Sequence, residues 1–156
     1  MKTAIIVSSK FGTGLRCADF IKSKVDNIDI YDLRKSSKID LSNYDSVILG
    51  ASIYASMVTG RMKKFIAKSK AELIGKQLGI FICCLENKEK AGKYITANFG
   101  NELEDSAKTK GFFGGIMDYS KLSFIERFLI SKLIKIPNGY STYSQKEIET
   151  FIDTFF

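Results

Sequence analysis

The opening stretch of the chain restricts the fold more than any other feature. A continuous apolar run at residues 3–7 leads into small and polar residues at 8–14, and a helical pattern follows from Leu15 to Val25. A continuous apolar run is typical of a parallel strand that is buried on both faces. The serines, threonine and glycines of 8–14 then precede a helix N-terminus, which favours an anion. The pattern predicts a strand, a phosphate-binding loop and a helix; the alternative is an ordinary tight turn.

Four more strands are predicted, each separated from the next by a loop or a helix. We expect them at residues 28–33, 46–51, 77–85 and 112–117. Residues 34–43 form a connection with a short helical turn, and Ser144 caps a closing helix through the pattern Ser144-x-x-Glu147. Alternating strands and helices predict an α/β fold with a five-stranded parallel sheet in the order 2-1-3-4-5. A ligand should meet the loops 8–14, 50–56 and 84–90 at the carboxyl ends of the strands.

Composition sets the outer limits on function. A chain of 156 residues that is 45% hydrophobic suits one domain, residues 1–156, with one core. The chain has neither a secretory signal nor a membrane-spanning stretch, and its three cysteines do not suit a disulfide framework, so we expect a cytoplasmic protein. Histidine is absent, which excludes a Ser-His-Asp triad and a histidine-ligated metal. We therefore expect no metal site, and a bound cofactor to supply the chemistry.

Two cofactor classes suit these loops. In a dinucleotide site, Gly12-Thr13-Gly14 would begin the Gly-x-Gly-x-x-Gly pattern and Asp32 would bind the ribose, but position 17 is Cys where a small residue is needed. In a mononucleotide site, the hydroxyl-rich loop holds one terminal phosphate and the other two loops flank a flat ring. A sheet of five strands favours the mononucleotide.

Two stretches resemble the flavodoxin-like FMN proteins. Residues Ser9 to Gly14 are similar to the phosphate loop Ser/Thr-x-Thr-Gly-x-Thr of that family, with Phe11 and Gly14 in place of two threonines. The stretch 43–53, Asn-Tyr-Asp-Ser-Val-Ile-Leu-Gly-Ala-Ser-Ile, resembles one subfamily, the menaquinone-dependent protoporphyrinogen IX dehydrogenases of haem synthesis. The resemblance implies a flavodoxin-like three-layer sandwich.

A long segment before the last helix resembles the same subfamily. Residues 118–143 form an insert that contains Ser123-Phe124-Ile125-Glu126-Arg127-Phe128 and the apolar and basic residues after them. The periodicity predicts an amphipathic helix at about 122–136. This helix covers the edge of the sheet, or it provides a face that docks on a membrane or forms a lipophilic substrate pocket, and the two roles can coexist.

The resemblance also implies a cofactor, partners and site residues. FMN would be the cofactor, a porphyrinogen and a quinone the substrates, and Tyr54 the aromatic residue beside the ring; no catalytic residue is identified. The residues expected to bind FMN are Ser8, Ser9, Lys10, Phe11, Gly12, Thr13, Gly14, Ala51, Ser52, Ile53, Tyr54, Ala55, Leu85, Glu86 and Asn87. The residues expected to meet substrate propionates are Arg61, Lys88, Lys90 and Lys121.

Net charge favours an anionic partner. Flavodoxins that serve soluble partners are typically acidic, whereas this chain carries +7. A lipid surface, reached from the inner face of the cell membrane, or the porphyrinogen fits this charge; nucleic acid does not, because the lysines are dispersed. Two other functions stay open: an electron carrier without a substrate of its own, and a module that has lost the cofactor.

Overall fold

The structure is a computed structural model that describes residues 1–36 and 38–156. Its centre is a parallel sheet of five strands in the order β2-β1-β3-β4-β5, which confirms the predicted topology. The strands are β1 Thr3–Ser8, β2 Ile28–Asp32, β3 Ser46–Ser52, β4 Gln77–Cys83 and β5 Ala107–Phe112. The helices around them are α1 Thr13–Lys24, α2 Gly60–Ile74, α3 Lys88–Phe99, α4 Asn101–Ser106 and α6 Gln145–Phe155.

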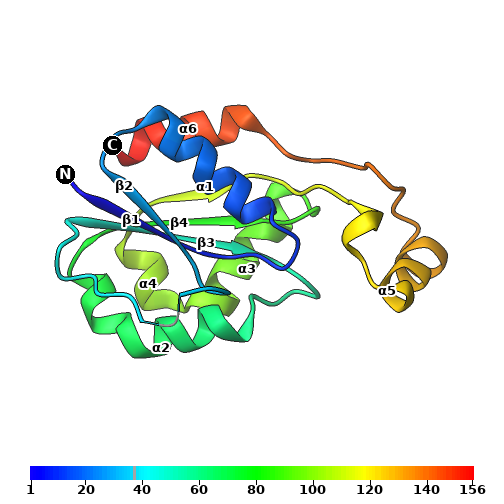
Figure 1. The fold of residues 1–156 in the computed structure, drawn as a ribbon, viewed down its shortest axis with the longest axis horizontal. Helices are drawn as coiled ribbons and strands as arrows, with labels where there is room; N and C mark the ends of the chain where they lie inside the picture. Colours follow the sequence, from blue (N-terminus) through cyan, green and yellow to red (C-terminus); the bar gives the residue numbers. More distant parts are fainter. Residues whose placement is uncertain (37) are drawn as a thin grey trace.

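The helices cover both faces of the sheet, so the fold has three layers (Figure 1). On one face, Cys17 and Ile21 of α1 and Phe151 of α6 belong to one apolar cluster. On the other face, residues of α2, α3 and α4 form a second cluster. Ile5 packs into the first cluster and Ile6 into the second. Burial on both faces explains why β1 is continuously apolar.

The fifth strand lies five residues earlier in the chain than the sequence predicts. We expected residues 112–117, whereas β5 is Ala107–Phe112, with the sequence Ala-Lys-Thr-Lys-Gly-Phe. It is an edge strand, and its alternating exposed residues gave it a polar pattern that resembled a loop. Gly114 has φ +73, a conformation that ends the strand. The apolar residues 113–117 lead instead from the sheet toward the insert.

The insert is held at the carboxyl end of the sheet and extends beyond it (Figure 1). It consists of the short helix η1 Tyr119–Lys121, then α5 Phe124–Leu129, which runs into one π-helical segment, η2 Ile130–Ile134. The helix is therefore shorter than the predicted 122–136, since Lys135 adopts φ +57 and ends it. Tyr119 Oη donates to the Ile136 carbonyl at 2.5 Å and closes the base of the insert. The edge strands are β2 and β5, and the main contacts of α5 are with η2 rather than with either of them.

The remaining differences from the predicted elements are small. β4 ends at Cys83, so Cys84 lies beyond the strand and is half-buried. Ser144 caps α6 as predicted, accepting from Glu147 N at 3.3 Å. In the described part of the connection 34–43 the chain makes a turn but no helix, and Ser37 lies outside the described residues. None of the helices described at 1–36 and 38–156 has the length and apolar character needed to cross a bilayer.

Candidate functional site

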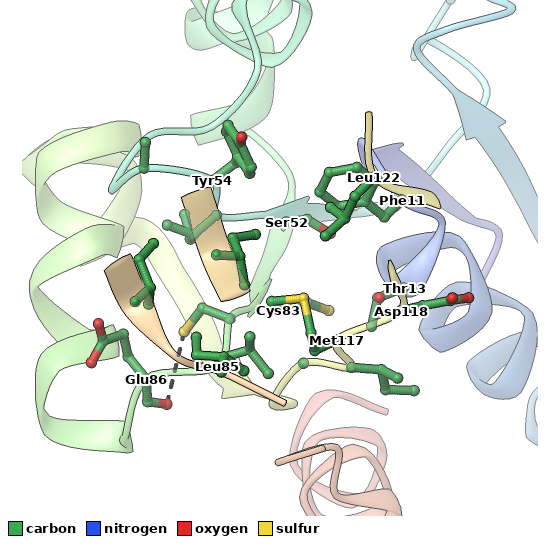
Figure 2. A pocket seen from close by; sticks show the side chains of 18 of the residues that line it. Phe11, Thr13, Ser52, Tyr54, Cys83, Leu85, Glu86, Met117, Asp118 and Leu122 are labelled. Atoms are coloured by element: carbon green, nitrogen blue, oxygen red, sulfur yellow. Dashed lines mark hydrogen bonds between the residues drawn. The ribbon is translucent and has the colours of Figure 1, made fainter. Parts of the chain in front are cut away.

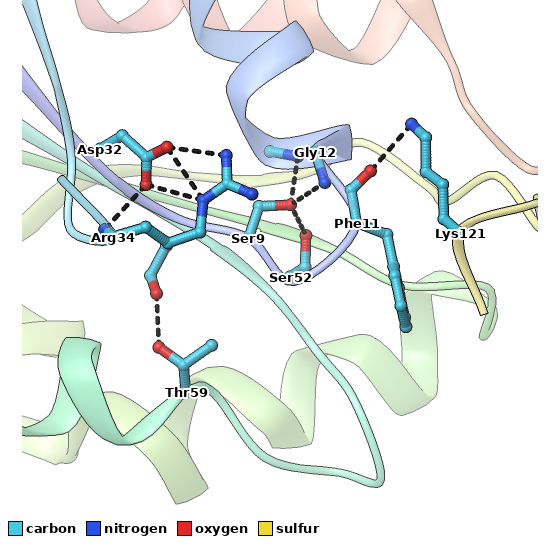
Figure 3. A network of polar contacts seen from close by, with 10 residues as sticks. Ser9, Phe11, Gly12, Asp32, Arg34, Ser52, Thr59 and Lys121 are labelled. Atoms are coloured by element: carbon cyan, nitrogen blue, oxygen red, sulfur yellow. Dashed lines mark hydrogen bonds and ion pairs between the residues drawn. The ribbon is translucent and has the colours of Figure 1, made fainter. Parts of the chain in front are cut away.

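The loop after β1 is shaped by a single buried hydroxyl. Ser9 Oγ accepts hydrogen bonds from the backbone N–H groups of Gly12 at 3.0 Å and Gly14 at 3.2 Å. Because both lone pairs of this oxygen are used, its hydrogen is available for Ser52 Oγ, 2.9 Å away at the end of β3. Gly12 adopts φ +91, which lets the chain turn directly into α1. The N–H groups of Gly12 and Gly14 are thus bonded to the Ser9 hydroxyl, which fixes the shape of the loop at the N-terminus of α1 (Figure 3).

A second hydroxyl reaches the loop from α2. Ser8 Oγ is hydrogen-bonded to Thr59 Oγ1, and Thr59 also caps α2 by accepting from Met62 N at 3.3 Å. Thr59 was not among the predicted site residues, although a Thr directly before a helical pattern is an N-cap signal. Two hydroxyl pairs therefore hold the first loop, Ser8 with Thr59 at the N-cap of α2 and Ser9 with Ser52 at the end of β3.

The structure explains why Phe11 and Gly14 stand where two threonines were expected. A Cβ on Gly14 would lie only 3.3 Å from both Ser9 Cβ and Val7 Cγ1, so a threonine here would require these side chains to shift. The ring of Phe11 packs edge-to-face on the ring of Tyr54, with centroids 5.8 Å apart. The first loop therefore has fewer hydroxyls and gains an aromatic wall.

Beside this loop lies a cavity of about 280 Å³. Figure 2 shows Thr13 of α1, Ser52 and Tyr54 around β3, and Leu85 and Glu86 after β4 at its wall. The three loops predicted to share one site therefore meet, at the switch point of the sheet. Most of the lining is apolar, which suits a flat ring with a few polar contacts.

The structure divides the predicted site residues into two groups. Those that line the cavity are Phe11, Thr13, Ser52, Ile53, Tyr54, Ala55, Leu85 and Glu86. Those that do not line it are Ser8, Ser9, Lys10, Gly12, Gly14, Ala51 and Asn87. Most of the second group form or support the phosphate loop. Ala51 is fully buried in the sheet, and Asn87 caps α3 by accepting from Lys90 N at 3.0 Å.

One wall of the cavity comes from residues that the sequence analysis did not assign to the site. Gly115 and Met117 follow β5, and the insert adds four apolar side chains. These are Leu122, Ile130, Ile134 and Ile136. Two features of the sequence indicated this wall: the Gly114-Gly115 pair, and the apolar face predicted for the insert. A Cβ on Gly115 would lie 3.0 Å from the Cys84 carbonyl carbon, so only a glycine lets these two backbone segments approach so closely.

Glu126 of the insert connects the first two loops. Its carboxylate is bound to the ammonium of Lys10, accepts from Tyr54 Oη at 2.8 Å and accepts from Ser123 N at 3.0 Å. Ser123 Oγ in turn accepts from Glu126 N, which completes a capping box for α5. These donors, Lys10 first, lower the pKa of Glu126 from 4.5 to about 2. The insert is thus fastened across the mouth of the site by an ionised carboxylate.

Cations surround the first loop, and they differ in how they are held. Arg34 makes a bidentate ion pair with Asp32, with Nε and Nη2 at 2.9 and 2.7 Å from Oδ2. This pairing lowers the pKa of Asp32 and occupies the carboxylate that a dinucleotide ribose would need. Lys121 of the insert donates to the Phe11 carbonyl at 2.9 Å. The other residues expected to meet propionates divide: Lys88 pairs with Glu147 and Lys90 with Glu86, whereas Arg61 is exposed on α2.

The donor set suits FMN. Among the hydrogen bonds of the described residues, none involves the N–H groups of Lys10, Phe11 and Thr13 or the Thr13 hydroxyl, so these donors at the start of α1 suit a terminal phosphate. The cavity beside Thr13 is walled by Phe11, Tyr54 and aliphatic side chains. No carboxylate lies within the loop 8–14 itself. A phosphate at the loop therefore has donors, and a flat ring in the cavity has apolar walls.

Comparison with known proteins agrees with this geometry. The chain is 27% identical over 125 residues to protoporphyrinogen IX dehydrogenase [quinone] of Leishmania major, covering 77% of this chain and 54% of that protein. The chain thus spans about half the length of this curated relative. A flavoprotein in complex with FMN from Lactobacillus acidophilus NCFM has a TM-score of 0.52 at 16% identity, over 77% of this chain and 95% of that one. Oxidised flavodoxin 1 of Bacillus cereus has a TM-score of 0.57 at 18% identity, over 98% of this chain and 93% of that one.

The two structural likenesses concern the fold, because their identities are low. The family assignment comes from the sequence profile of the flavodoxin domain, which matches residues 4–144 and so includes all five strands and the insert. This match supports the FMN cofactor that the sequence predicts. By fold, site geometry and sequence, the chain belongs to the flavodoxin domain family.

Proposed function

We propose that this protein is an FMN-dependent oxidoreductase that passes reducing equivalents from a porphyrinogen to a quinone. The observation that carries the proposal is the cavity at the switch point, because it joins a phosphate loop to an apolar wall supplied by the insert. An electron carrier needs an exposed ring edge and no such wall. The named activity of the Leishmania major relative supports the same reaction.

The residues have distinct parts in this proposal. The N–H groups of the first loop and the Thr13 hydroxyl hold the phosphate, while Ser8 and Ser9 fix the shape of the loop through their bonds to Thr59 and Ser52. Tyr54 lies against one side of the ring. FMN, when bound, accepts a hydride equivalent and passes it on. The insert excludes water from the ring through the buried Ile130, and the exposed Ile134 beside it offers an apolar surface to a macrocycle. The net charge of +7 favours a substrate that carries carboxylates.

The test compares two neighbouring residues of the insert. Ile134 lines the cavity, whereas Leu133 does not and is 73% exposed. We expect purified protein with FMN to oxidise protoporphyrinogen IX anaerobically when a menaquinone analogue is present. Ile134→Glu should greatly slow this turnover and leave FMN binding intact, and Leu133→Glu serves as the matched control. An FMN-loaded protein that never turns over porphyrinogen contradicts the proposal.

A carrier of electrons without its own substrate is the second candidate. It is favoured by the likeness to flavodoxin 1 over nearly the whole length of both chains. This candidate predicts rapid electron exchange with a soluble redox protein, no porphyrinogen turnover, and no effect of Ile134→Glu. A module without cofactor, the third alternative, predicts a colourless protein at micromolar FMN.

That residues 1–156 form a single domain also stays a prediction.

We further propose that the insert rests on an anionic membrane surface at the inner face of the cell membrane. Its outer side exposes Phe124, Ile125, Phe128 and Leu133, with Phe124 87% exposed, and Arg127 and Lys132 lie among them. Apolar and basic residues together are the features that bind anionic lipid. Wild-type protein should float with vesicles of phosphatidylglycerol and phosphatidylcholine, and the double variant Phe124→Ser, Leu133→Ser should not. Ile74→Ser, at an exposed apolar site on α2, is the control; unchanged flotation of the double variant contradicts this contact.

A further inference from the structure

The first loop carries less binding chemistry for a phosphate than its length suggests. Phe11 and Gly14 bring no hydroxyl. Ser8 Oγ is bonded to Thr59, and Ser9 Oγ serves Gly12, Gly14 and Ser52. A phosphate monoester carries a charge of about −1.5 to −2 at neutral pH. A positive group beside the loop would therefore strengthen binding considerably.

The cations that belong to the loop and its helix are already engaged. Lys10 is bound to Glu126, and its ammonium lies over the ring of Tyr54, 4.0 Å from the centroid. Arg16, in the first part of α1, lies over the ring of Tyr143 at 5.3 Å. Lys10 and Arg16 would each have to give up these contacts to direct their charge to the inside of the loop.

Lys121 is held differently. Its ammonium donates to the Phe11 carbonyl at 2.9 Å and lies 3.8 Å from the position that a Cβ on Gly12 would take (Figure 3). Its nearest carboxylate oxygen, Asp118 Oδ2, is 4.0 Å away, at the outer limit of an ion pair, while Asp118 Oδ1 accepts from Ser120 N at 2.9 Å and Ser120 Oγ at 2.6 Å. An ammonium has three donors, so two remain after the bond to Phe11. Because Gly12 has no side chain, no side-chain atom of Gly12 lies between the Lys121 ammonium and the loop.

We propose that Lys121 is a phosphate-binding residue: the insert supplies to the FMN phosphate the charge that the first loop lacks. This inference rests on the proposed FMN binding and adds a residue outside the phosphate loop. It also links two events, because a phosphate held partly by Lys121 fastens the insert over the cavity. Cofactor binding and insert closure therefore stabilise each other.

The test compares FMN with riboflavin, which lacks the phosphate. Lys121→Met should weaken FMN binding about tenfold at low salt, the size of one charge-assisted contact at a half-exposed site. The same variant should leave riboflavin affinity unchanged. At about 1 M salt, where the screening length is about 3 Å, the difference between variant and wild type should largely vanish. Lys121→Arg should retain most of the FMN affinity.

The matched control is Lys132→Met, which removes the same charge from the same insert. Among the hydrogen bonds and ion pairs of residues 1–36 and 38–156, none joins Lys132 to the first loop. Equal losses of FMN and riboflavin in Lys121→Met, or a loss no larger than that of Lys132→Met, overturn the inference while FMN binding by the wild type stands. A wild type that binds neither flavin overturns the proposed cofactor and this inference together.

A second readout follows the insert itself. Thermolysin cleaves before exposed leucine, isoleucine and phenylalanine, several of which lie on α5. FMN should slow this cleavage in the wild type, riboflavin should slow it less, and Lys121→Met should remove the difference between the two flavins. Equal protection by both flavins in the wild type contradicts the link between phosphate and insert.

Discussion

Removing the carboxylate of Glu126 should release the insert from the site without unfolding the sheet. This carboxylate joins Lys10 of the first loop, Tyr54 of the second and Ser123 at the start of α5. Glu126→Gln removes the charge but keeps the side-chain length, and glutamine still suits a capping box. Glu126→Ala removes the charge, the bond to Tyr54 and the reciprocal cap together.

The magnitude follows from the pKa of Glu126. Its fall from 4.5 to about 2 corresponds to at most about 3 kcal/mol of favourable interaction with the ionised form. Because the Lys10 side chain is 42% exposed, solvent reduces the charge contribution to about 1 kcal/mol. The bond to Tyr54 and the cap add about 1 kcal/mol more. Opening of the insert should therefore become about fivefold easier in Glu126→Gln and about thirtyfold easier in Glu126→Ala.

The assay is native-state proteolysis with thermolysin, followed by mass spectrometry of the fragments. When opening is fast relative to cleavage, the cleavage rate reports the population of the open insert. Cuts should fall near Leu129 and Leu133, and urea unfolding of the sheet, followed by circular dichroism, should change little. Glu147→Ala removes a carboxylate bound to Lys88, outside the insert, and should leave these cleavage rates unchanged.

The pH dependence gives an independent check. A carboxylate whose pKa is lowered in the folded state stabilises that state above its ordinary pKa of 4.5, and the contribution is lost as the pH falls toward about 2. The wild-type insert should therefore become easier to cleave as the pH falls below about 4.5, with an acid-tolerant protease, whereas Glu126→Ala should respond less. Identical cleavage rates of wild type and Glu126→Ala at pH 7 would refute the reasoning.

Two further predictions concern the frame of the site. Asp32→Asn should lower the free energy of unfolding by about 1–2 kcal/mol at pH 7, because the Arg34 guanidinium loses its carboxylate partner. Because the pKa of Asp32 is lowered in the folded protein, the difference in unfolding free energy between wild type and variant should shrink as the pH falls below 3.8. Urea titrations at pH 7 and pH 3 measure this difference. Gly114→Ala should cost about 2–4 kcal/mol, since Gly114 has φ +73 and a Cβ would lie 1.8 Å from the Thr142 carbonyl oxygen. Gly139→Ala, at φ +80 with no atom within 4 Å, should cost about 1 kcal/mol in the same urea assay; equal losses at the two glycines would contradict the steric argument.

The framework of the fold was predictable because its signals are local. The apolar runs of β1, β3 and β4 mark strands that are buried on both faces, and crossover handedness then leaves few sheet orders. β5 was misplaced for the opposite reason. Its residues alternate between exposed and buried, as in an edge strand. The apolar residues after it are buried outside a strand, Phe113 against Phe81 and α6, and Met117 against the insert.

The candidate site was predictable only in part, for a related reason. Loops at the carboxyl ends of neighbouring parallel strands must meet, so Thr13, Ser52 and Tyr54 could be brought together from the order of the strands alone. The position of the insert does not follow from strand order. Its capping pattern, Ser123-x-x-Glu126, is visible in the sequence, yet the pattern says nothing of Lys10 or Tyr54.

The sequence pattern of this chain was therefore enough to predict the parallel sheet, the phosphate loop and the place where they meet. These features depend on periodicity and chirality, which act over a few residues at a time. Contacts between residues more than a hundred positions apart needed the folded chain. Lys121 at the Phe11 carbonyl and Glu126 at Lys10 depend on where a 26-residue insert, at 118–143, lies after folding. Such contacts depend on shape and charge in three dimensions, and they place the wall and the extra cation at the flavin site.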